Sequence, residues 1–291
     1  MAWRAVWWAG AAGLAALLAV RGLRRGSLSP SGAAAAGGVG LLSLGAMPRG
    51  GVAMLAFYLS GSRLTRLGAV TKAAQDRGYR TGGQRDAAQV LACSALATGL
   101  GLAHLALCGE VDSRVFGGRA DPLHAAAVLG IAAHYATCAA DTFASELGSL
   151  ARTQPVLITA PTRRVPPGTN GGITALGLAA SAVGGAFIGT VMWAVGAIVN
   201  ADQLVWHQDW QLIPFAAAIG LAGSLLDSLL GAMVQETLFD PRKKQIVHEP
   251  GPSAERISGR ALLSNQQVNL VSVAIMTAIG CACGQRLATR P

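Results

Sequence analysis

Long apolar runs, separated by short polar gaps, dominate this sequence. A helix needs about 20 apolar residues to cross the hydrocarbon layer of a membrane, with a range of about 17–25. The eight runs are 3–20, 31–47, 51–60, 87–108, 123–149, 172–199, 211–239 and 266–284. Six of them are long enough to span, the run at 31–47 is marginal, and the run at 51–60 is too short. The pattern predicts an all-α fold, a polytopic transmembrane helix bundle with six to eight membrane segments.

Composition supports a single integral membrane domain over residues 1–291. Charged residues make up 13% of the chain, whereas soluble domains carry roughly 25%, and the mean hydropathy is +0.44. The 38 glycines fit such a bundle, since glycine lets membrane helices approach closely. Seven or eight spans with short loops use the whole chain, so we expect the lipid bilayer as its surroundings and no second domain.

The distribution of basic residues predicts how the chain is threaded. Of the 23 Lys and Arg residues, 3 lie in 21–30, 6 in 61–86, 3 in 150–171 and 5 in 240–265. Lys and Arg concentrate in the cytoplasmic loops of membrane proteins. We therefore place these four segments in the cytoplasm and both termini on the opposite side. The net charge of +9 follows from this loop pattern, and we expect no nucleic-acid partner.

This threading makes residues 31–60 enter and leave the membrane on the same side. Two runs of 17 and 10 residues are short for two full spans, so we expect a tight or re-entrant hairpin that turns at residues 48–51. Irregular backbone at membrane depth is tolerated only where protein surrounds it. A single span across 31–60 would put six basic residues on the outer side, which the charge rule disfavours.

Three acidic residues lie inside the predicted spans. Asp141 and Glu146 fall in the fifth run, and Asp227 falls in the middle of the seventh. A charge at the bilayer centre costs at least about 2.5–3.5 kcal/mol on insertion scales, so such residues are retained for function or for pairing. At 100° per residue, Asp141 and Glu146 lie about 140° apart and flank a polar arc. Three interpretations stay open: a carboxylate cluster that holds Mg²⁺ against phosphate oxygens, a polar network that locks helices together, and a proton or ion relay.

Polar segments on the predicted cytoplasmic side complement these acids. A glycine-rich turn at 166–172 leads into the sixth run, where free N–H groups and the helix dipole favour an anion. Its candidate phosphate-binding residues are Gly168, Thr169, Asn170, Gly171 and Gly172. Residues 82–86 place Arg85 before the fourth run, and Asn265 and Asn269 enter the eighth. Each feature alone is typical of a helix start or a membrane anchor, but their convergence on one face predicts a phosphate-binding site.

Six blocks of the chain resemble a known family. They are GLRRGSLSPSGAAAAGG (22–38), LTRLGAVTKAAQDRGYRTGGQRDAAQV (64–90), AADTFASELG (139–148), VPPGTNGG (165–172), GSLLDSLLGAMVQ (223–235) and ISGRALLSNQQVNL (257–270). Taken together they are similar to the transmembrane protein 19 family, which also contains the plant chloroplast phytyl-phosphate kinase. The chain departs from the usual family residues at Asp86, at Ser94–Ala95 and at Ser264.

The resemblance implies an isoprenoid-phosphate kinase that transfers a phosphoryl group from CTP or another nucleoside triphosphate to a prenyl monophosphate. With the residues above, it predicts that Asp141, Glu146 and Asp227 hold Mg²⁺ and that Arg85 acts with them in catalysis. Residues 168–172, with Asn265 and Asn269, are then expected to bind the nucleotide. The expected membrane is the endoplasmic reticulum or the plastid envelope.

Two other functions stay open at this point. One is a transporter or flippase for a lipid phosphate, with Asp141 and Asp227 as ion-coupled sites. The other is a structural membrane protein without turnover. The polar motifs favour the enzyme because they cluster on one face, whereas the site of a transporter should lie near the midplane and open to both sides.

Overall fold

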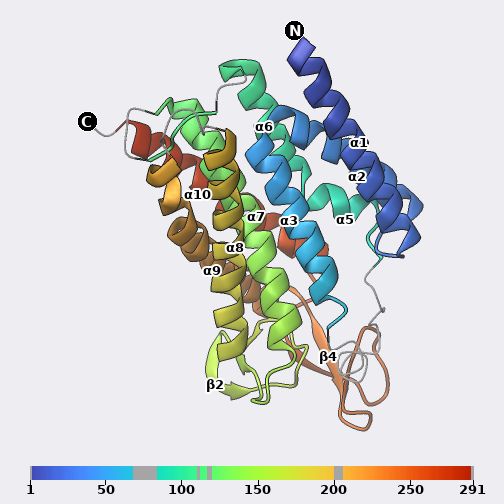
Figure 1. Cartoon of the computed structure of the whole chain (residues 1–291). Helices are drawn as coiled ribbons and strands as arrows, with labels where there is room; N and C mark the ends of the chain where they lie inside the picture. Colours follow the sequence, from blue (N-terminus) through green and yellow to red (C-terminus); the bar gives the residue numbers. More distant parts are fainter. Residues whose placement is uncertain (1, 68–83, 110–111, 117–119, 200–205, 290–291) are drawn as a thin grey trace.

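The computed structural model describes residues 2–67, 84–109, 112–116, 120–199 and 206–289. The helices are α1 (Ala2–Arg24), α2 (Pro30–Ala46), α3 (Pro48–Leu64), α5 (Ala87–Ala92), α6 (Ala95–Cys108), α7 (Pro122–Gly148), α8 (Ala175–Val199), α9 (Leu212–Val234) and α10 (Asn265–Ala288), with a 3₁₀ turn η2 (Trp206–Gln211). Five of the described helices, α1 and α7 to α10, are long and apolar enough to cross a membrane. The polytopic helix bundle is thereby confirmed (Figure 1).

Local sequence signals fix where the helices begin. Helices α2, α3 and α7 each start at a proline, which suits the first helical position because proline lacks an N–H there. Ser29 caps α2 by accepting the N–H of Gly32 at 3.0 Å. Helix α10 begins with a capping box, in which Ser264 and Gln267 bond to each other's backbone N–H groups. Such caps satisfy N–H donors that have no partner inside the helix.

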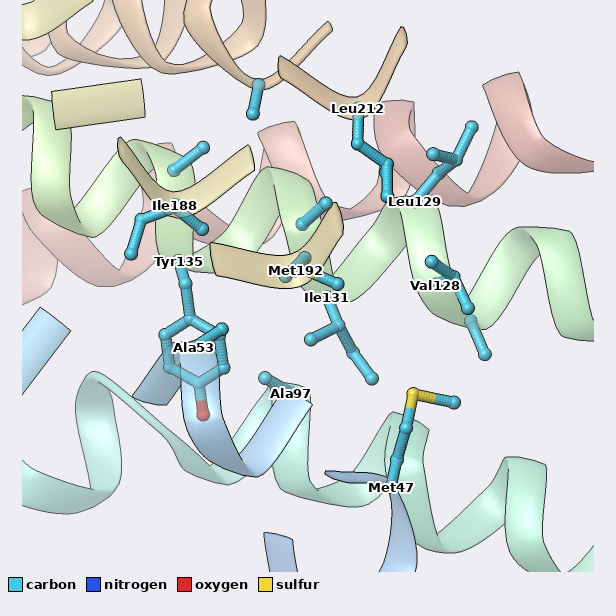
Figure 2. Close-up of a cluster of buried hydrophobic side chains, with 14 of the residues drawn as sticks. Met47, Ala53, Ala97, Val128, Leu129, Ile131, Tyr135, Ile188, Met192 and Leu212 are labelled. Carbon is cyan, nitrogen blue, oxygen red and sulfur yellow. The ribbon is translucent and has the colours of Figure 1, made fainter. Parts of the chain in front are cut away.

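Helix α7 is the centre of the bundle. Within its apolar stretch, 94% of the residues are buried, and α3, α6, α8, α9 and α10 pack around it. Figure 2 shows the core that they form, which includes Met47, Ala53, Ala97, Val128, Leu129, Ile131, Tyr135, Ile188, Met192 and Leu212. Because it is held from all sides, α7 can place polar groups near its C-terminal end with little freedom of movement.

The predicted hairpin is present, but it turns at Met47 and not at residues 48–51, which belong to α3, and its second arm is longer than the apolar run at 51–60 suggested. Met47 alone joins α2 to α3, and each of these helices has 17 residues. The guanidinium of Arg66, just after α3, donates to the backbone oxygen of Arg25, just before α2, at 3.3 Å. The two arms therefore start and finish at the same end of the bundle (Figure 1).

The run at 87–108 is not the single span that its length predicted. It breaks at Cys93 and Ser94 into α5 and α6. The Ser94 hydroxyl donates to the oxygen of Val90 at 2.6 Å, and the imidazole of His134 on α7 hydrogen-bonds to the oxygen of Cys93 at 2.9 Å. Polar partners thus satisfy the backbone where the helix stops, which apolar content alone does not reveal.

Two small antiparallel sheets, which the sequence did not predict, occupy the basic segments 150–171 and 240–265 and the adjoining ends of the sixth and seventh apolar runs. One has the order β2-β1-β3 and the other β5-β4-β6. Their strands are β1 (Val156–Leu157), β2 (Ala160–Arg164), β3 (Gly172–Ile173), β4 (Thr237–Asp240), β5 (Gln245–Val247) and β6 (Glu255–Ser258). The sheets lie together at one end of the bundle, here named the sheet end, whereas α1 begins and α10 finishes at the other end (Figure 1).

Candidate functional site

A close crossing of α7 and α9 brings two carboxylates to one place. A side chain at Gly220 would meet the backbone of α7, and one at Gly223 would meet Thr137, so glycine is what permits this approach. Asp141 lies one helical turn beyond Thr137, and Asp227 lies one turn beyond Gly223. Both aspartates are seven residues from the last residue of their helices, roughly 10 Å at 1.5 Å per residue.

Two cavities meet at these carboxylates. The larger has a volume of about 600 Å³ and opens between α3, α5, α7, α9 and α10. The smaller has a volume of about 220 Å³ and lies between α7, α8, α9 and the glycine-rich turn. Asp141, Asp227 and Asn265 line both cavities. The two aspartates therefore stand at a junction that is reached from two directions.

Every predicted site residue lines one or both of these cavities. Arg85, Glu146 and Asn269 line the larger cavity. All five turn residues, Gly168, Thr169, Asn170, Gly171 and Gly172, line the smaller one. Gly82 and Gly83, part of the predicted segment before Arg85, lie outside the described residues. Among the described residues, the predicted site residues thus line two adjoining cavities, but the three predicted metal ligands, Asp141, Glu146 and Asp227, do not form one close group.

Helix α10 fixes the carboxylate of Asp227. The hydroxyl of Ser272 donates to Asp227 Oδ2 at 2.8 Å. With its amide oriented to satisfy its neighbours, Asn269 also donates to Asp227 Oδ2 at 3.2 Å and to the backbone oxygen of Asn265 at 3.0 Å. Sequence reasoning missed Ser272, although Asn265, Asn269 and Ser272 follow the i, i+4, i+7 spacing of one helix face.

The two aspartates match the number of carboxylates that a phosphate-bound magnesium ion usually takes from a protein. Among the described residues, no group of three or more His, Cys, Asp or Glu side chains is gathered closely enough to hold a metal. Mg²⁺ usually takes only one or two protein carboxylates and completes its shell with water and phosphate oxygens. Asp141 and Asp227 supply that number. Glu146, the third predicted ligand, lines the larger cavity without reaching the smaller one.

Arg85 is held in place from its backbone and from its side chain. Its backbone N–H donates to Ser27 at 3.1 Å, and its oxygen accepts the N–H of Ser29 at 2.9 Å. Its Nη1 donates to the hydroxyl of Ser62 at 3.0 Å, and its guanidinium carbon lies 5.8 Å from the ring centre of Tyr58. A guanidinium has five N–H donors, and among the described residues the Ser62 hydroxyl is the one hydrogen-bond acceptor of the Arg85 guanidinium, which leaves donors for an anion in the cavity.

The glycine-rich turn differs from the expected phosphate cradle in its hydrogen bonds. The N–H of Thr169 donates to Pro166 at 3.2 Å, and that of Gly172 donates to Thr169 at 2.9 Å. The N–H of Asn170 donates to the hydroxyl of Thr237 on β4 at 3.1 Å. These donors are already used, so among the described residues only the N–H groups of Gly168 and Gly171 have no acceptor in this turn. The expected row of free donors is therefore reduced to two.

The turn also does not run directly into a helix, as the sequence suggested. Strand β3 follows it, and α8 begins only at Ala175, with the Thr174 hydroxyl accepting the N–H of Gly177 at 3.0 Å. Gly171 has a φ of +79°, and a side chain there would meet Ala232 on α9. The turn is consequently a rigid wall of the smaller cavity, held against α9 and β4.

A second charged cluster, which the sequence did not reveal, lies where α3, α7 and α9 begin. Arg49 is only 1% exposed. Its Nε bonds Asp112 at 2.8 Å and its Nη1 bonds Asp209 at 2.8 Å. Asp209 also accepts the N–H groups of Val115 and Phe116 at 3.0 and 3.1 Å. One signal in the sequence pointed to this cluster. Arg49 lies in the predicted turn of the re-entrant hairpin, and a charged side chain at membrane depth needs a partner.

Together these features define a class, a multi-pass helical membrane protein with a carboxylate-bearing polar cavity at one end of its bundle. The chain belongs to the family described as integral membrane protein DUF92, which it matches over residues 13–277, and the resemblance to the transmembrane protein 19 family is confirmed. It is 37% identical over 261 residues to Protein PGR of Arabidopsis thaliana, covering 89% of this chain and 90% of that protein.

A more distant relative is the uncharacterized membrane protein MJ0933 of Methanocaldococcus jannaschii. It is 29% identical over 154 residues, which cover 53% of this chain and 50% of that protein. No solved structure matches the chain.

Proposed function

We propose that the chain is a membrane-embedded isoprenoid-phosphate kinase, which transfers a phosphoryl group from a nucleoside triphosphate to a prenyl monophosphate. The observation that carries this proposal is the position of Asp141 and Asp227 at the junction of two cavities. Phosphoryl transfer needs a donor and an acceptor phosphate facing each other in line, with positive charge between them. Two cavities that meet at a carboxylate pair suit this requirement.

The smaller cavity suits the triphosphate of the donor, and the larger suits the acceptor phosphate. Gly168 and Gly171 line the donor side, and Asn265 lines both cavities. Arg85 lines only the larger cavity of the two, where it would bind and orient the acceptor. An acceptor oxygen then attacks the γ-phosphorus, the bond to the bridging oxygen breaks, and the nucleoside diphosphate leaves.

In this proposal Asp141 and Asp227 would hold Mg²⁺, and Glu146 lines the larger cavity on the acceptor side. When bound, the ion neutralises the charge that spreads over the phosphate oxygens. Ser272 and Asn269 keep the Asp227 carboxylate in one orientation. Such fixed positioning is how a site without covalent chemistry accelerates the reaction.

The far end of the bundle favours an enzyme over a transporter or flippase. Arg49, Asp112 and Asp209 are paired and buried there, and the core of α7 separates them from the site. Transport would need a path that opens at both ends, and the described residues line the two cavities only near the sheet end. The structural role without turnover would leave two polar cavities unexplained.

The test uses the purified protein in lipid nanodiscs with Mg²⁺, labelled CTP, ATP or GTP, and a series of prenyl monophosphates. We expect a labelled prenyl diphosphate that forms only with Mg²⁺ and is absent from a matched Asp141→Asn preparation. Absence of product with every pair of substrates would overturn the proposal. Movement of a lipid phosphate across liposomes without nucleotide would support the transporter instead.

We further propose that the basic sheet end faces the cytoplasm, in the endoplasmic reticulum or the plastid envelope. The basic segments 150–171 and 240–265 form the sheets of this end, as expected of cytoplasmic loops. In a variant without the native cysteines, Gln245→Cys should react with an impermeant reagent from the cytoplasmic side, and Arg4→Cys from the other side. Labelling of both from the same side would contradict this orientation.

A further inference from the structure

A third cavity lies beside the larger one and has the opposite chemistry. Its volume is about 70 Å³, and it is lined by residues of α1, α2, α3 and α5. Its walls are almost entirely apolar and include Ala15, Ala36, Val39, Met54 and Val90. Arg85 is the one charged residue that lines it among the residues that the structure describes. This space, here named the apolar pocket, is otherwise built like a protein core.

The apolar pocket and the larger cavity share a wall. Phe57, Arg85, Gln89 and Cys93 line both of them. Arg85 therefore stands where a polar chamber with two aspartates meets an apolar one. Tyr58 supports this position, because its ring faces the Arg85 guanidinium and its hydroxyl hydrogen-bonds to Ser27 Oγ at 2.9 Å. A charge at such a boundary matches a ligand with a charged head and an apolar tail.

We propose that the apolar pocket holds carbons of the prenyl chain of the acceptor lipid that follow the first five, while the phosphate and those first five carbons lie in the larger cavity at Arg85. This inference rests on the proposed function, since it assigns the tail of the same substrate. The pocket is too small for a long chain, so the remaining carbons extend beyond it along α1. Only 22% of the apolar stretch of α1 is buried, which leaves a surface for those carbons at the edge of the bundle.

The pocket predicts selection by chain length rather than by the charge of the head group. Ala36 lines the pocket from α2, whereas Ala34 is an exposed alanine on the same helix and does not line it. Ala36→Leu adds volume inside the pocket, and Ala34→Leu adds the same volume outside it. The two variants form a matched pair, because a change in how substrates partition into the membrane affects both equally.

The experiment compares the KM for prenyl monophosphates of 5 and 20 carbons in nanodiscs. We expect Ala36→Leu to raise the KM for the 20-carbon substrate at least tenfold relative to Ala34→Leu. The KM for the 5-carbon substrate should change less than twofold, and kcat should be nearly unchanged for both. Equal KM values for the two variants at both lengths would overturn the inference.

A binding measurement separates this inference from the proposed function. Cys93 lines both cavities, so its alkylation, followed by peptide mass spectrometry, reports occupancy without turnover. The 20-carbon monophosphate should protect Cys93 in the wild type and in Ala34→Leu, but not in Ala36→Leu. Protection without any turnover would overturn the kinase and support the pocket. Turnover without chain-dependent protection would overturn the pocket and leave the kinase standing.

The wild-type protein alone keeps the inference testable if Ala36→Leu does not fold. In that case Cys93 alkylation of the wild type is compared with saturating 5-carbon and with saturating 20-carbon monophosphate. Slower alkylation of Cys93 with the longer ligand supports the pocket. Equal rates with both ligands overturn it.

Discussion

The two ends of the bundle treat charged groups in opposite ways. Where α3, α7 and α9 begin, Arg49 is buried between Asp112 and Asp209 with bonds of 2.8 Å. At the sheet end, Asp141 and Asp227 border about 600 and 220 Å³ of open space. Both ends carry charge inside a membrane bundle, where an unpaired charge is costly.

The difference indicates which charges serve packing and which serve a ligand. Arg49 has its partners within the protein, and a side chain at Gly196 would collide with it, so the space around it is filled. The aspartates at the sheet end share cavities with an arginine and with amide groups. Removing a packed charge should therefore reduce stability, whereas removing a cavity-lining charge should reduce activity.

Neutralising the aspartates should give the largest effect. We expect Asp227→Asn and Asp141→Asn each to lower turnover about a thousandfold, since the loss of a metal carboxylate costs several kcal/mol and each 1.36 kcal/mol is tenfold. The melting temperature should change by only a few degrees. Turnover and thermal unfolding are measured on the same preparations. Near-normal turnover in both variants would assign the aspartates to packing and remove the contrast between the two ends.

Removing Arg49 should have the reverse effect. Arg49→Met leaves Asp112 and Asp209 buried without their cation, and breaking a buried pair in this way costs about 3–5 kcal/mol. Turnover per folded molecule should stay close to that of the wild type, because no atom of Arg49 lines the cavities of the site. The double variant Arg49→Met with Asp209→Asn serves as the control and should recover part of the stability. An unchanged melting temperature for Arg49→Met would contradict the packing role.

Some parts of the fold could be predicted from the sequence and others could not. Helices α7 to α10 follow from apolar length because a membrane leaves the backbone few other solutions. The break at Cys93 and Ser94 could not be predicted, since apolar residues continue across it and its partner, His134, lies 41 residues away. The two sheets were missed because strands of two to five residues carry too little alternation to detect.

The candidate site was more predictable than its details. The motifs all fall at chain positions that one end of the bundle brings together, so their convergence follows from threading alone. The exact hydrogen bonds do not, because Asn170 is bound by Thr237 on a strand that was not predicted. The pairing of Arg49 with Asp209 spans 160 residues, and no local pattern contains it.

Ser272 should give a smaller effect than the aspartate that it holds. Ser272→Ala removes one hydrogen bond to the Asp227 carboxylate, and hydrogen bonds to charged groups are worth about 1.5–3 kcal/mol. We expect a roughly tenfold fall in turnover and a higher Mg²⁺ requirement. Ser272→Thr keeps the hydroxyl and should restore both. A loss of stability with an unchanged Mg²⁺ requirement would indicate a packing role for Ser272.

The smallest effect is expected far from the site, at the start of α7. Asp121 Oδ1 accepts the N–H groups of His124 and Leu123, each at 2.9 Å. The bond from His124 lowers the pKa of Asp121, burial opposes this, and the bond from Leu123 lowers the pKa further. Replacing an N-cap residue with alanine costs about 1 kcal/mol. Asp121→Ala should therefore lower the melting temperature slightly at pH 7 and leave turnover unchanged.

The pH dependence of this difference tests its cause. Because the pKa is lower in the folded protein, the contribution of the ionised Asp121 is complete above the ordinary aspartate pKa of about 3.9. It is lost as the pH falls through the lower pKa of the folded state. The melting temperatures of wild type and Asp121→Ala should thus converge below about pH 4. Asp121→Asn, which caps helices about as well as aspartate without titrating, should keep its advantage over alanine at both pH values. A wild-type advantage over Asp121→Ala that persists undiminished in acid would mean that Asp121 stabilises α7 through packing rather than through its charge.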